Sequence, residues 1–587
     1  MNNAVHGGDE GARDKAWLGD LCWVLLVSAP FTFWGIGLTF LDPDEGLYGS
    51  ITREMLESRD WIVTRFNGLL YLEKPPLFFW LSALTLSLAE PSEWPMRLWS
   101  ILPGLGTVIL VWLIGRMAYG RRAGLFAALA FTSSAGYVLY VWKASTDFLL
   151  VFSVTLAMYG FLRDARTPNR TWIRFWLLYL GIALGLLTKG LIGAVFPVLI
   201  VGTFLLWARN LRLAELNLLR GMMLVAVVVL PWHLLTLWRD PELMWFYLVD
   251  NQLLRFLAIR DILEDDVTVS TLGFWLVTLI WFSPWCLFLC ARRTMANAAP
   301  FQEWRVLMPI WALAVMVFFS LSRSKLEFYG LPALPAFAVM VGGAWQSGRD
   351  IGRWLWLGTG AAVLAGWALI KVGSGITPNA AMYLLAQMNA YYRILLDQGM
   401  SFPFPSPQPL GEIMRLMGVT LMAGWSGAAV LWSAKRRDAS FGVMVVMCGV
   451  MGILIMQIVE FVEPQHSVKG VASALNQHAA PGDVIVHEGS IEYSAALPFY
   501  TGQRIVVLAE SSKRPGARLD LLKSGVRQGS GREWFVGPTE FAALWGGARR
   551  VFLVTQWPRS DSAVARMPEP SVREIGQFGS RRLYSNR

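Results

Sequence analysis

The feature that most constrains this chain is a series of apolar runs, each about long enough to cross a lipid bilayer. A transmembrane helix needs about 20 mostly apolar residues, within a range of about 17–25. Thirteen runs lie near this length, at 17–40, 96–118, 123–142, 147–162, 172–188, 190–208, 221–238, 271–291, 305–321, 328–346, 353–371, 411–433 and 441–462. Backbone polar groups within the hydrocarbon must be satisfied inside the segment, so each run is expected to be helical. The chain is therefore predicted to be a polytopic α-helical membrane protein among membrane lipids.

Composition supports a membrane protein and argues against a soluble protein that binds nucleic acid. Of the 587 residues 55% are hydrophobic, and the mean hydropathy is +0.46. The net charge of +10 would suggest nucleic acid in a soluble protein. Here Lys and Arg fall mainly in short loops between the runs, as membrane topology alone produces. We expect no nucleic-acid partner. The four cysteines lie within apolar runs without zinc or disulfide spacing, so they are interpreted as packing residues.

The positive-inside rule sets the topology. A short apolar run at 75–88 is ambiguous. If it does not cross, the basic loops near residues 121, 166, 212, 291, 350 and 434 all lie on one side of the membrane. We therefore interpret it as an interfacial helix. About 13 spans then follow a cytoplasmic segment 1–16, and everything after residue 462 lies outside. No cleavage motif follows the first run, so it is expected to remain as a span.

This topology predicts three parts. A transmembrane domain covers 17–462, with external loops at 41–95 and 239–270. From residue 463 the composition changes to that of a small external α/β domain, 463–587. In it, 467–477 is expected to be a helix with Ser467 as N-cap. The segments 483–487, 504–508 and 549–556 are expected to be strands, and 492–500 and 538–547 helical. Its histidines show no metal-ligand spacing.

The loop 41–76 carries an unusual density of charge next to a membrane span, with seven acids and four bases. Charge at a membrane boundary is costly and usually marks function. Other charges, at 143, 147, 189 and 323–327, reach the same external face in the predicted topology. Lys and Arg can stabilise a departing phosphate, and a carboxylate can accept the proton of an attacking hydroxyl. The residues alone therefore indicate a membrane enzyme or a transporter with an anionic external ligand. No Walker loop or GxGxxG motif indicates a nucleotide.

Several motifs, in order along the chain, resemble a known family. They are DPDEGLYG (42–49), LYLEKPPLFFWL (70–81), ASTDFLLVF (144–152), GLLTKGLIGAVFP (185–197), PWH (231–233), YLVDNQLLRF (247–256) and FFSLSRSKLEFYGLPALPAFA (318–338). They are similar to the GT-C superfamily of polyprenyl-phosphate-sugar glycosyltransferases, and most to its ArnT-like members within the protein O-mannosyltransferase clan. The resemblance is specific over 17–345 and looser beyond. It implies the GT-C fold with 13 spans, interfacial helices in the first external loop and an external α/β domain.

The resemblance also implies roles for individual residues. Among the acids, Asp44 is expected to act as general base or to orient the acceptor. Glu45 beside it is expected to orient or to have a structural role, and Asp147 is expected to be a second acid of the site. Among the bases, Lys74 and Lys189 are expected to contact the donor phosphate. The positive lining would be completed by Arg255 and Lys325, and supporting roles fall to Glu73 and Tyr329. No cofactor is expected, and dependence on a divalent metal is left open.

The chain differs from the family pattern at one position. The related segment before the RF motif usually contains a histidine, as in EHIQRF, where this chain has Gln252. Any metal or acceptor role of that histidine would be lost, which weakens a strict assignment to aminoarabinose transfer onto lipid A.

The prediction is a multi-pass protein of the bacterial inner membrane with its active site at the periplasmic face. It would move a sugar, 4-amino-4-deoxy-L-arabinose or a hexose, from undecaprenyl phosphate to lipid A, a glycan or a protein. The alternative is a transporter or flippase of a lipid-linked or anionic solute, which inverted repeats would favour. No internal symmetry of that kind is evident.

Overall fold

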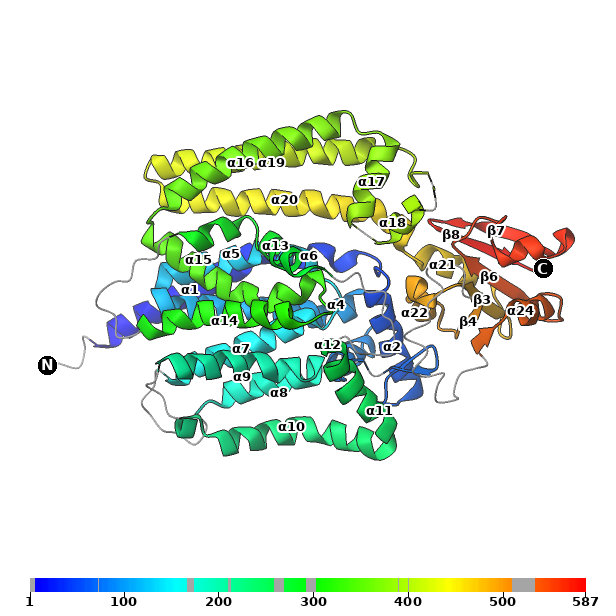
Figure 1. The fold of residues 1–587 in the computed structure, drawn as a ribbon, viewed down its shortest axis with the longest axis horizontal. Helices are drawn as coiled ribbons and strands as arrows, with labels where there is room; N and C mark the ends of the chain where they lie inside the picture. The colour runs from blue at the N-terminus through cyan, green and yellow to red at the C-terminus, as the bar shows by residue number, and fades with distance from the viewer. Residues whose placement is uncertain are drawn as a thin grey trace.

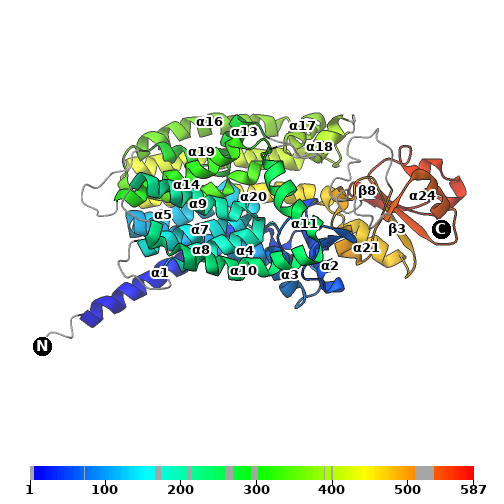
Figure 2. The ribbon, with the colours of Figure 1, turned by 60° about the horizontal axis from the view of Figure 1, so that its bottom comes forward.

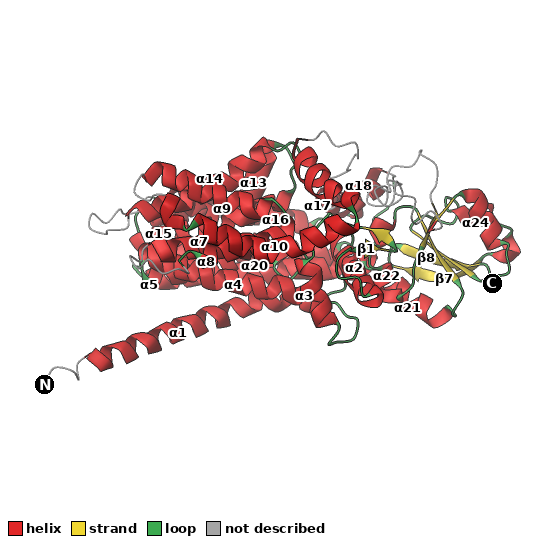
Figure 3. Ribbon diagram, turned by 90° about the horizontal axis from the view of Figure 1, so that it is seen from below, coloured by secondary structure: helices red, strands yellow, loops and turns green. Residues whose placement is uncertain are grey.

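The computed structural model describes residues 6–71, 73–165, 174–208, 213–257, 269–291, 302–388, 390–397, 399, 401–508 and 534–587. A bundle of helices forms most of the molecule, and a small domain with a β-sheet lies at the end opposite the N-terminus (Figure 1, Figure 3). Parts of the predicted basic loops near 166, 212 and 291, of the external loop 239–270 and of the segment 1–16 lie outside the described residues.

The described part of the chain contains eight helices long and apolar enough to cross a membrane. Their principal elements are α1 (His6–Phe33), α4 (Trp94–Tyr119), α7 (Asp147–Ala165), α10 (Leu218–Arg239), α15 (Leu334–Ser347), α16 (Ile351–Ser374), α19 (Gln408–Ser433) and α20 (Arg437–His466). Three further predicted runs form shorter apolar helices, α8 (Trp176–Lys189), α9 (Ile192–Ala208) and α14 (Gln302–Leu321). The polytopic helical class is confirmed, while the count of thirteen spans stays a prediction.

Two predicted runs are not single helices, which corrects the sequence-based expectation. The run 123–142 divides into α5 (Arg121–Thr132) and α6 (Ala135–Tyr140). Between them the hydroxyls of Ser133 and Ser134 donate to preceding carbonyls at 2.5 and 2.7 Å, an alternative to the helical ladder. The run 271–291 divides into α13 (Thr271–Trp281) and the 3₁₀ segment η4 (Trp285–Cys290). Pro284 at that break has no N–H to continue the helix.

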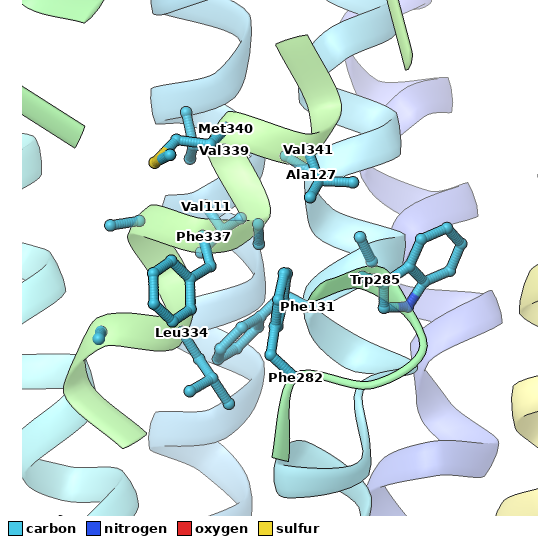
Figure 4. Close-up of a cluster of buried hydrophobic side chains, with 14 of the residues drawn as sticks. Val111, Ala127, Phe131, Phe282, Trp285, Leu334, Phe337, Val339, Met340 and Val341 are labelled. Atoms are coloured by element: carbon cyan, nitrogen blue, oxygen red, sulfur yellow. The ribbon is translucent and has the colours of Figure 1, made fainter. Parts of the chain in front are cut away.

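The bundle has a continuous apolar core where α4, α5 and α15 meet (Figure 4). Its members include Val111, Ala127, Phe131, Phe282, Trp285, Leu334, Phe337, Val339, Met340 and Val341. The helices α16, α19 and α20 pack together along one side of the bundle in Figure 1, and Figure 2 shows the same bundle turned by 60°. There α16 and α19 touch through backbone, since a β-carbon on Gly366 would lie 2.6 Å from the carbonyl oxygen of Gly418. Small residues permit such close helix contacts in membranes.

The first external loop contains α2 (Asp44–Ser58), a two-stranded hairpin and α3 (Leu77–Leu86). The hairpin pairs β1 (Arg65–Phe66) with β2 (Leu69–Leu70). The ten residues of α3 are fewer than a spanning helix needs, which agrees with the interfacial interpretation of 75–88. The second external loop contains α11 (Pro241–Trp245), the π-helix η3 (Phe246–Leu254) and α12 (Arg255–Leu257). The segment before α19 forms α17 (Pro378–Met388) and α18 (Ala390–Asp397).

The C-terminal domain is a six-stranded sheet in the order β5-β4-β3-β6-β8-β7 among the described residues. The parallel strands are β5 (Phe535–Val536), β4 (Val506–Leu508), β3 (Val484–Glu488) and β6 (Val551–Thr555), and the antiparallel edge is formed by β8 (Arg581–Ser585) and β7 (Arg573–Phe578). Strands at β3, β4 and β6 were predicted, and those at β5, β7 and β8 were not. Helix α21 (Lys469–His478) has Val468 as N-cap, one residue after the predicted Ser467. The Ser467 hydroxyl still accepts from the Lys469 N–H at 3.1 Å.

The sheet and the first external loop share one apolar core. Period-two alternation places Ile485 and Val507 on the face with α21 and α22 (Leu497–Thr501), and the same cluster includes Ile51 and Met55 of α2. The opposite face is covered by Phe541 of α24 (Pro538–Trp545) and its neighbours. The helix that begins at Asp44 is therefore fixed to the C-terminal domain by packing.

Candidate active site

Helix α2 begins at Asp44, and its first turn gives the adjacent acids Asp44 and Glu45 different exposure to solvent. The first turn of a helix presents free N–H groups and favours negative charge. Asp44 is exposed, whereas the Glu45 side chain is buried, with 2% exposure. The two neighbouring carboxylates therefore lie in different environments, and only Asp44 has access to an incoming ligand.

Glu45 is held by a buried ion pair with Arg97 of α4, whose side chain is fully buried. The guanidinium donates to both carboxylate oxygens, Nε to Oε1 at 3.0 Å and Nη2 to Oε2 at 2.9 Å. It also donates to the backbone carbonyls of residues 35, 36, 38 and 39. The Ala144 N–H adds a hydrogen bond to Glu45 Oε1 at 2.7 Å. This network joins α2 to the end of the first span and to the segment before Asp147, so Glu45 has the contacts of a positioning residue.

Asp147 and Lys189 form an ion pair between two helix ends. Asp147 is the first residue of α7 and Lys189 the last of α8, so each charge lies at the helix end that favours its sign. The Ser145 hydroxyl donates to Asp147 Oδ2 at 3.0 Å. The Lys189 Nζ also lies 5.3 Å from the ring centre of Phe328 and 6.0 Å from that of Tyr329. The structure thus brings Asp147, Lys189 and Tyr329 together.

Glu73 and Lys74 lie in the loop before α3, and both are half-buried. The Asn251 Nδ2 group donates to the backbone carbonyl of Glu73 at 2.6 Å, which ties this loop to the π-helix η3. Arg255 follows directly after η3 and is half-buried. The second external loop therefore lies against the predicted phosphate-contact segment.

Four of the predicted charges surround one buried phenol, that of Tyr48 on α2. Burial is the main cause that raises the pKa of Tyr48 well above its usual value. The charged groups that act on the same phenol are Asp44, Asp147, Glu73 and Arg255. The three carboxylates raise the pKa further and the guanidinium opposes them. Groups from four separate segments therefore converge on this point.

Tyr48 lies within the DPDEGLYG motif, and the sequence alone assigns it no role of its own. The available signal was its position four residues after Asp44, which places both on one side of α2.

Lys325 is placed differently from the other predicted bases. Its side chain is 6% exposed, and its Nζ donates to the Ser322 carbonyl within the same turn. Its backbone carbonyl accepts from the Val269 N–H at 2.9 Å. These two hydrogen bonds reach residues 322 and 269 rather than Asp147 or Lys189, so the part of Lys325 in the positive lining stays a prediction.

Within the described ranges, no group of three or more His, Cys, Asp or Glu side chains is placed to hold a metal ion. The predicted absence of a cofactor stays a prediction. His487 of the C-terminal domain is buried and bonds to the Ser494 hydroxyl at 2.9 Å. Burial, together with the charge of Arg581, lowers the pKa of His487 to about 4, so it is neutral at ordinary pH and structural in its contacts.

Hydrogen bonds also fix the first loop to the C-terminal domain. Asp42 Oδ1 accepts from the Ala496 N–H at 3.0 Å. The Asn67 side chain exchanges two hydrogen bonds with the backbone of Ile505, each 2.8 Å long. Asp42 is two residues from Asp44, so this interface sets the start of the helix that presents the exposed acid.

Known proteins include relatives of similar sequence and solved structures of similar fold. Residues 42–247 match the family model described as dolichyl-phosphate-mannose-protein mannosyltransferase. An uncharacterised protein of Aquifex aeolicus is 31% identical over 332 residues, which are 55% of this chain and 72% of that protein. Undecaprenyl phosphate-alpha-4-amino-4-deoxy-L-arabinose arabinosyl transferase 1 of Pseudomonas fluorescens is 30% identical over 384 residues. That match covers 63% of either protein, so the chain spans somewhat less than two thirds of this relative.

Among solved structures, ArnT from Cupriavidus metallidurans bound to undecaprenyl phosphate matches with a TM-score of 0.77 and 23% identity. The match covers 97% of this chain and 98% of that one. The predicted combination of helical bundle and terminal α/β domain is therefore a shared fold along almost the whole chain.

Proposed function

We propose a function from one premise: the chain belongs to the GT-C superfamily of polyprenyl-phosphate sugar transferases. This confirms the resemblance carried by the motifs between 42 and 338. The proposed enzyme is a multi-pass protein of the bacterial inner membrane. It takes a sugar, 4-amino-4-deoxy-L-arabinose or a hexose, from undecaprenyl phosphate and passes it to lipid A or another envelope acceptor. We place the reaction and the C-terminal domain on the periplasmic side, as the basic loops favour.

One observation carries this proposal. Asp44, Asp147, Glu73 and Arg255 converge on the Tyr48 phenol, and Asp147 is paired with Lys189. The cluster is formed by the first external loop, Arg255 of the second external loop and the ends of α7 and α8. The cluster therefore contains both cations and carboxylates. A cation can stabilise the phosphate that the reaction releases, and a carboxylate can take the proton of the acceptor.

The proposed step is a displacement at the anomeric carbon of the sugar. The acceptor oxygen forms the new bond as the bond from that carbon to the phosphate oxygen breaks, and the electron pair leaves with undecaprenyl phosphate. Lys74 and Lys189 would stabilise the phosphate charge, with Arg255 beside them. Asp44 would take the proton of a hydroxyl acceptor, or orient an acceptor that is already an anion.

The charge of Lys189 is neutralised by its ion pair with Asp147. A phosphate that arrives at Lys189 would share the ammonium with this carboxylate. Asp147 would thereby keep Lys189 in place and moderate its hold on the leaving carrier lipid, which has to depart after transfer.

A transporter remains the second candidate class, but no observation favours it. The predicted charges gather in the first half of the chain, and the named relatives are sugar transferases.

The test is a mass-spectrometric comparison of lipid A and total envelope glycans from cells with and without the gene, and from a Lys74→Ala strain. We expect one sugar to disappear from one acceptor in both deficient strains, with a loss of transfer of about 100-fold or more for Lys74→Ala. Lys371→Ala is a matched control, because this exposed lysine lies on α16 against Trp367. If Lys74→Ala transfers normally while the gene deletion depletes the outer carrier-linked pool, the transporter is the correct interpretation.

The acceptor class can be read from Asp44→Asn in the purified enzyme. A hydroxyl acceptor needs a base, so the change should lower transfer by about 10²–10⁴-fold. A phosphate acceptor does not, so the loss should stay well below that of Lys74→Ala. Complete loss with a phosphate acceptor, in folded protein, would refute the positioning role.

A further inference from the structure

The π-helix η3 lies between the two segments that carry the proposed phosphate-contact lysines. On one side Asn251 donates to the backbone carbonyl of Glu73, which precedes Lys74. On the other side η3 contacts Gly190, which follows Lys189. A β-carbon on Gly190 would lie 2.8 Å from Tyr247 Oη and 2.7 Å from Gln252 Nε2. π-Helical segments occur frequently at functional sites, where they reposition side chains.

Two buried oxygens of η3 have no hydrogen-bond partner within the described structure. They are Tyr247 Oη and Asn251 Oδ1, on side chains that are 0% and 5% exposed. A buried polar group without a partner is costly, and such groups in native proteins call for an explanation. Packing explains the Tyr247 ring, which contacts Trp232 and His233 at centroid distances of 5.6 and 5.8 Å. It does not explain the hydroxyl, because phenylalanine would pack equally well.

The chemistry of the two atoms is defined by their surroundings. The Asn251 nitrogen must face the Glu73 carbonyl, since only the amide nitrogen can donate to it. The remaining Oδ1 is thus an acceptor only, suited to a hydroxyl or an ammonium group. The Tyr247 hydroxyl can donate and accept. Neither atom carries a positive charge, so the pair suits a hydroxyl or amino group beside a phosphate rather than the phosphate itself.

We propose that Tyr247 Oη and Asn251 Oδ1 form a subsite for the hydroxyl or amino groups of the donor sugar. The inference rests on the proposed function and adds the residues that distinguish a sugar-carrying lipid from the bare carrier. A phosphate held by Lys74 and Lys189 places its attached sugar next to residues that adjoin both lysines. The sugar then supplies hydrogen-bond partners for the two oxygens, which have none within the described structure.

The test is Tyr247→Phe in the full-length protein, which removes only the hydroxyl. Binding is measured in detergent by titration with undecaprenyl phosphate alone and with undecaprenyl phosphate carrying 4-amino-4-deoxy-L-arabinose or a hexose. We expect about 10-fold weaker binding of the sugar-carrying lipid, because a sugar group is left without its partner. Binding of the bare carrier should not change, and the melting temperature should stay equal or rise.

Two further variants separate this role from a structural one. Asn251→Ala also loses the hydrogen bond to Glu73, so it should weaken binding of both lipids. Tyr179→Phe removes a buried hydroxyl that donates to the Leu216 carbonyl at 2.8 Å, so it should lower stability and leave the ratio of the two affinities unchanged.

Equal affinities of Tyr247→Phe and wild type for the sugar-carrying lipid would overturn the subsite, as would an equal loss for both lipids. If wild-type protein binds neither lipid and transfers no sugar, the proposed function itself fails.

Discussion

Replacing Arg97 by methionine tests whether the buried ion pair holds the exposed acid of α2 in place. Methionine has similar length and packs well in an apolar site, so the change mainly removes the charge and the donors. Glu45 would be left as a carboxylate with 2% exposure and without its cation. Breaking a buried pair in this way costs about 3–5 kcal/mol.

The structure sets the expected size. Besides both oxygens of Glu45, the guanidinium serves four backbone carbonyls between residues 35 and 39. Each lost hydrogen bond adds about 1 kcal/mol where water cannot replace it. We expect Arg97→Met to lower the free energy of unfolding by about 4 kcal/mol or more, which is close to a thousandfold in the equilibrium constant.

The assay is denaturant unfolding in detergent micelles, followed by tryptophan fluorescence, with sugar transfer measured on the same preparation. Arg122→Ala is the matched control, because its pair with Asp438 is exposed and should contribute less than about 1 kcal/mol. Adding Glu45→Gln to Arg97→Met should recover about 1 kcal/mol or more, since the lone buried charge is gone. A loss for Arg97→Met no greater than that of the control would refute the reasoning.

Three other changes have defined outcomes. Asn67→Ala removes both hydrogen bonds to Ile505, so we expect a loss of about 2 kcal/mol and faster proteolytic release of the C-terminal domain. Burial raises the pKa of Asp42 from 3.8 to about 8, so the fold favours its protonated form. The contribution of Asp42 to the free energy of unfolding is fully present below about pH 4 and is lost as the pH rises through 8. Asp42→Asn should remove this dependence and flatten the melting temperature over the same pH range. A steady melting temperature for wild type across that range would contradict the assignment. In Gly190→Ala, alanine would have to adopt a φ of +72°, and its β-carbon would clash with the Tyr247 hydroxyl. We therefore expect sugar transfer to fall and the free energy of unfolding to drop by about 1–3 kcal/mol. Unchanged values would mean that η3 shifts freely.

Periodicity and charge were sufficient to predict the helical class, the short helix at 75–88 and three buried strands, because each signal is local. The sequence did not show which charged residues form ion pairs with one another. Arg97 lies at the start of an apolar run and resembles a cation that reaches for the membrane surface, so nothing local distinguishes it as the partner of Glu45. The predicted topology places Asp147 and Lys189 on the external side of the membrane, yet only the tertiary structure shows that they form an ion pair. Strands β7 and β8 were missed because their sequences, REIGQF and RRLYS, carry too many polar residues for a buried strand.

The hydrogen bond from Ala496 to Asp42 spans 454 residues of sequence. Synthesis proceeds from the N-terminus, so the loop that carries Asp44 is made long before the domain that packs against it exists. Until the last strands are added, the core shared by α2 and the sheet is incomplete, and the start of α2 is held by the Glu45–Arg97 pair without the contacts of the C-terminal domain. We therefore expect a chain truncated after α20 to keep the long apolar helices but to lose the interface that fixes the first external loop, and so to show little or no sugar transfer.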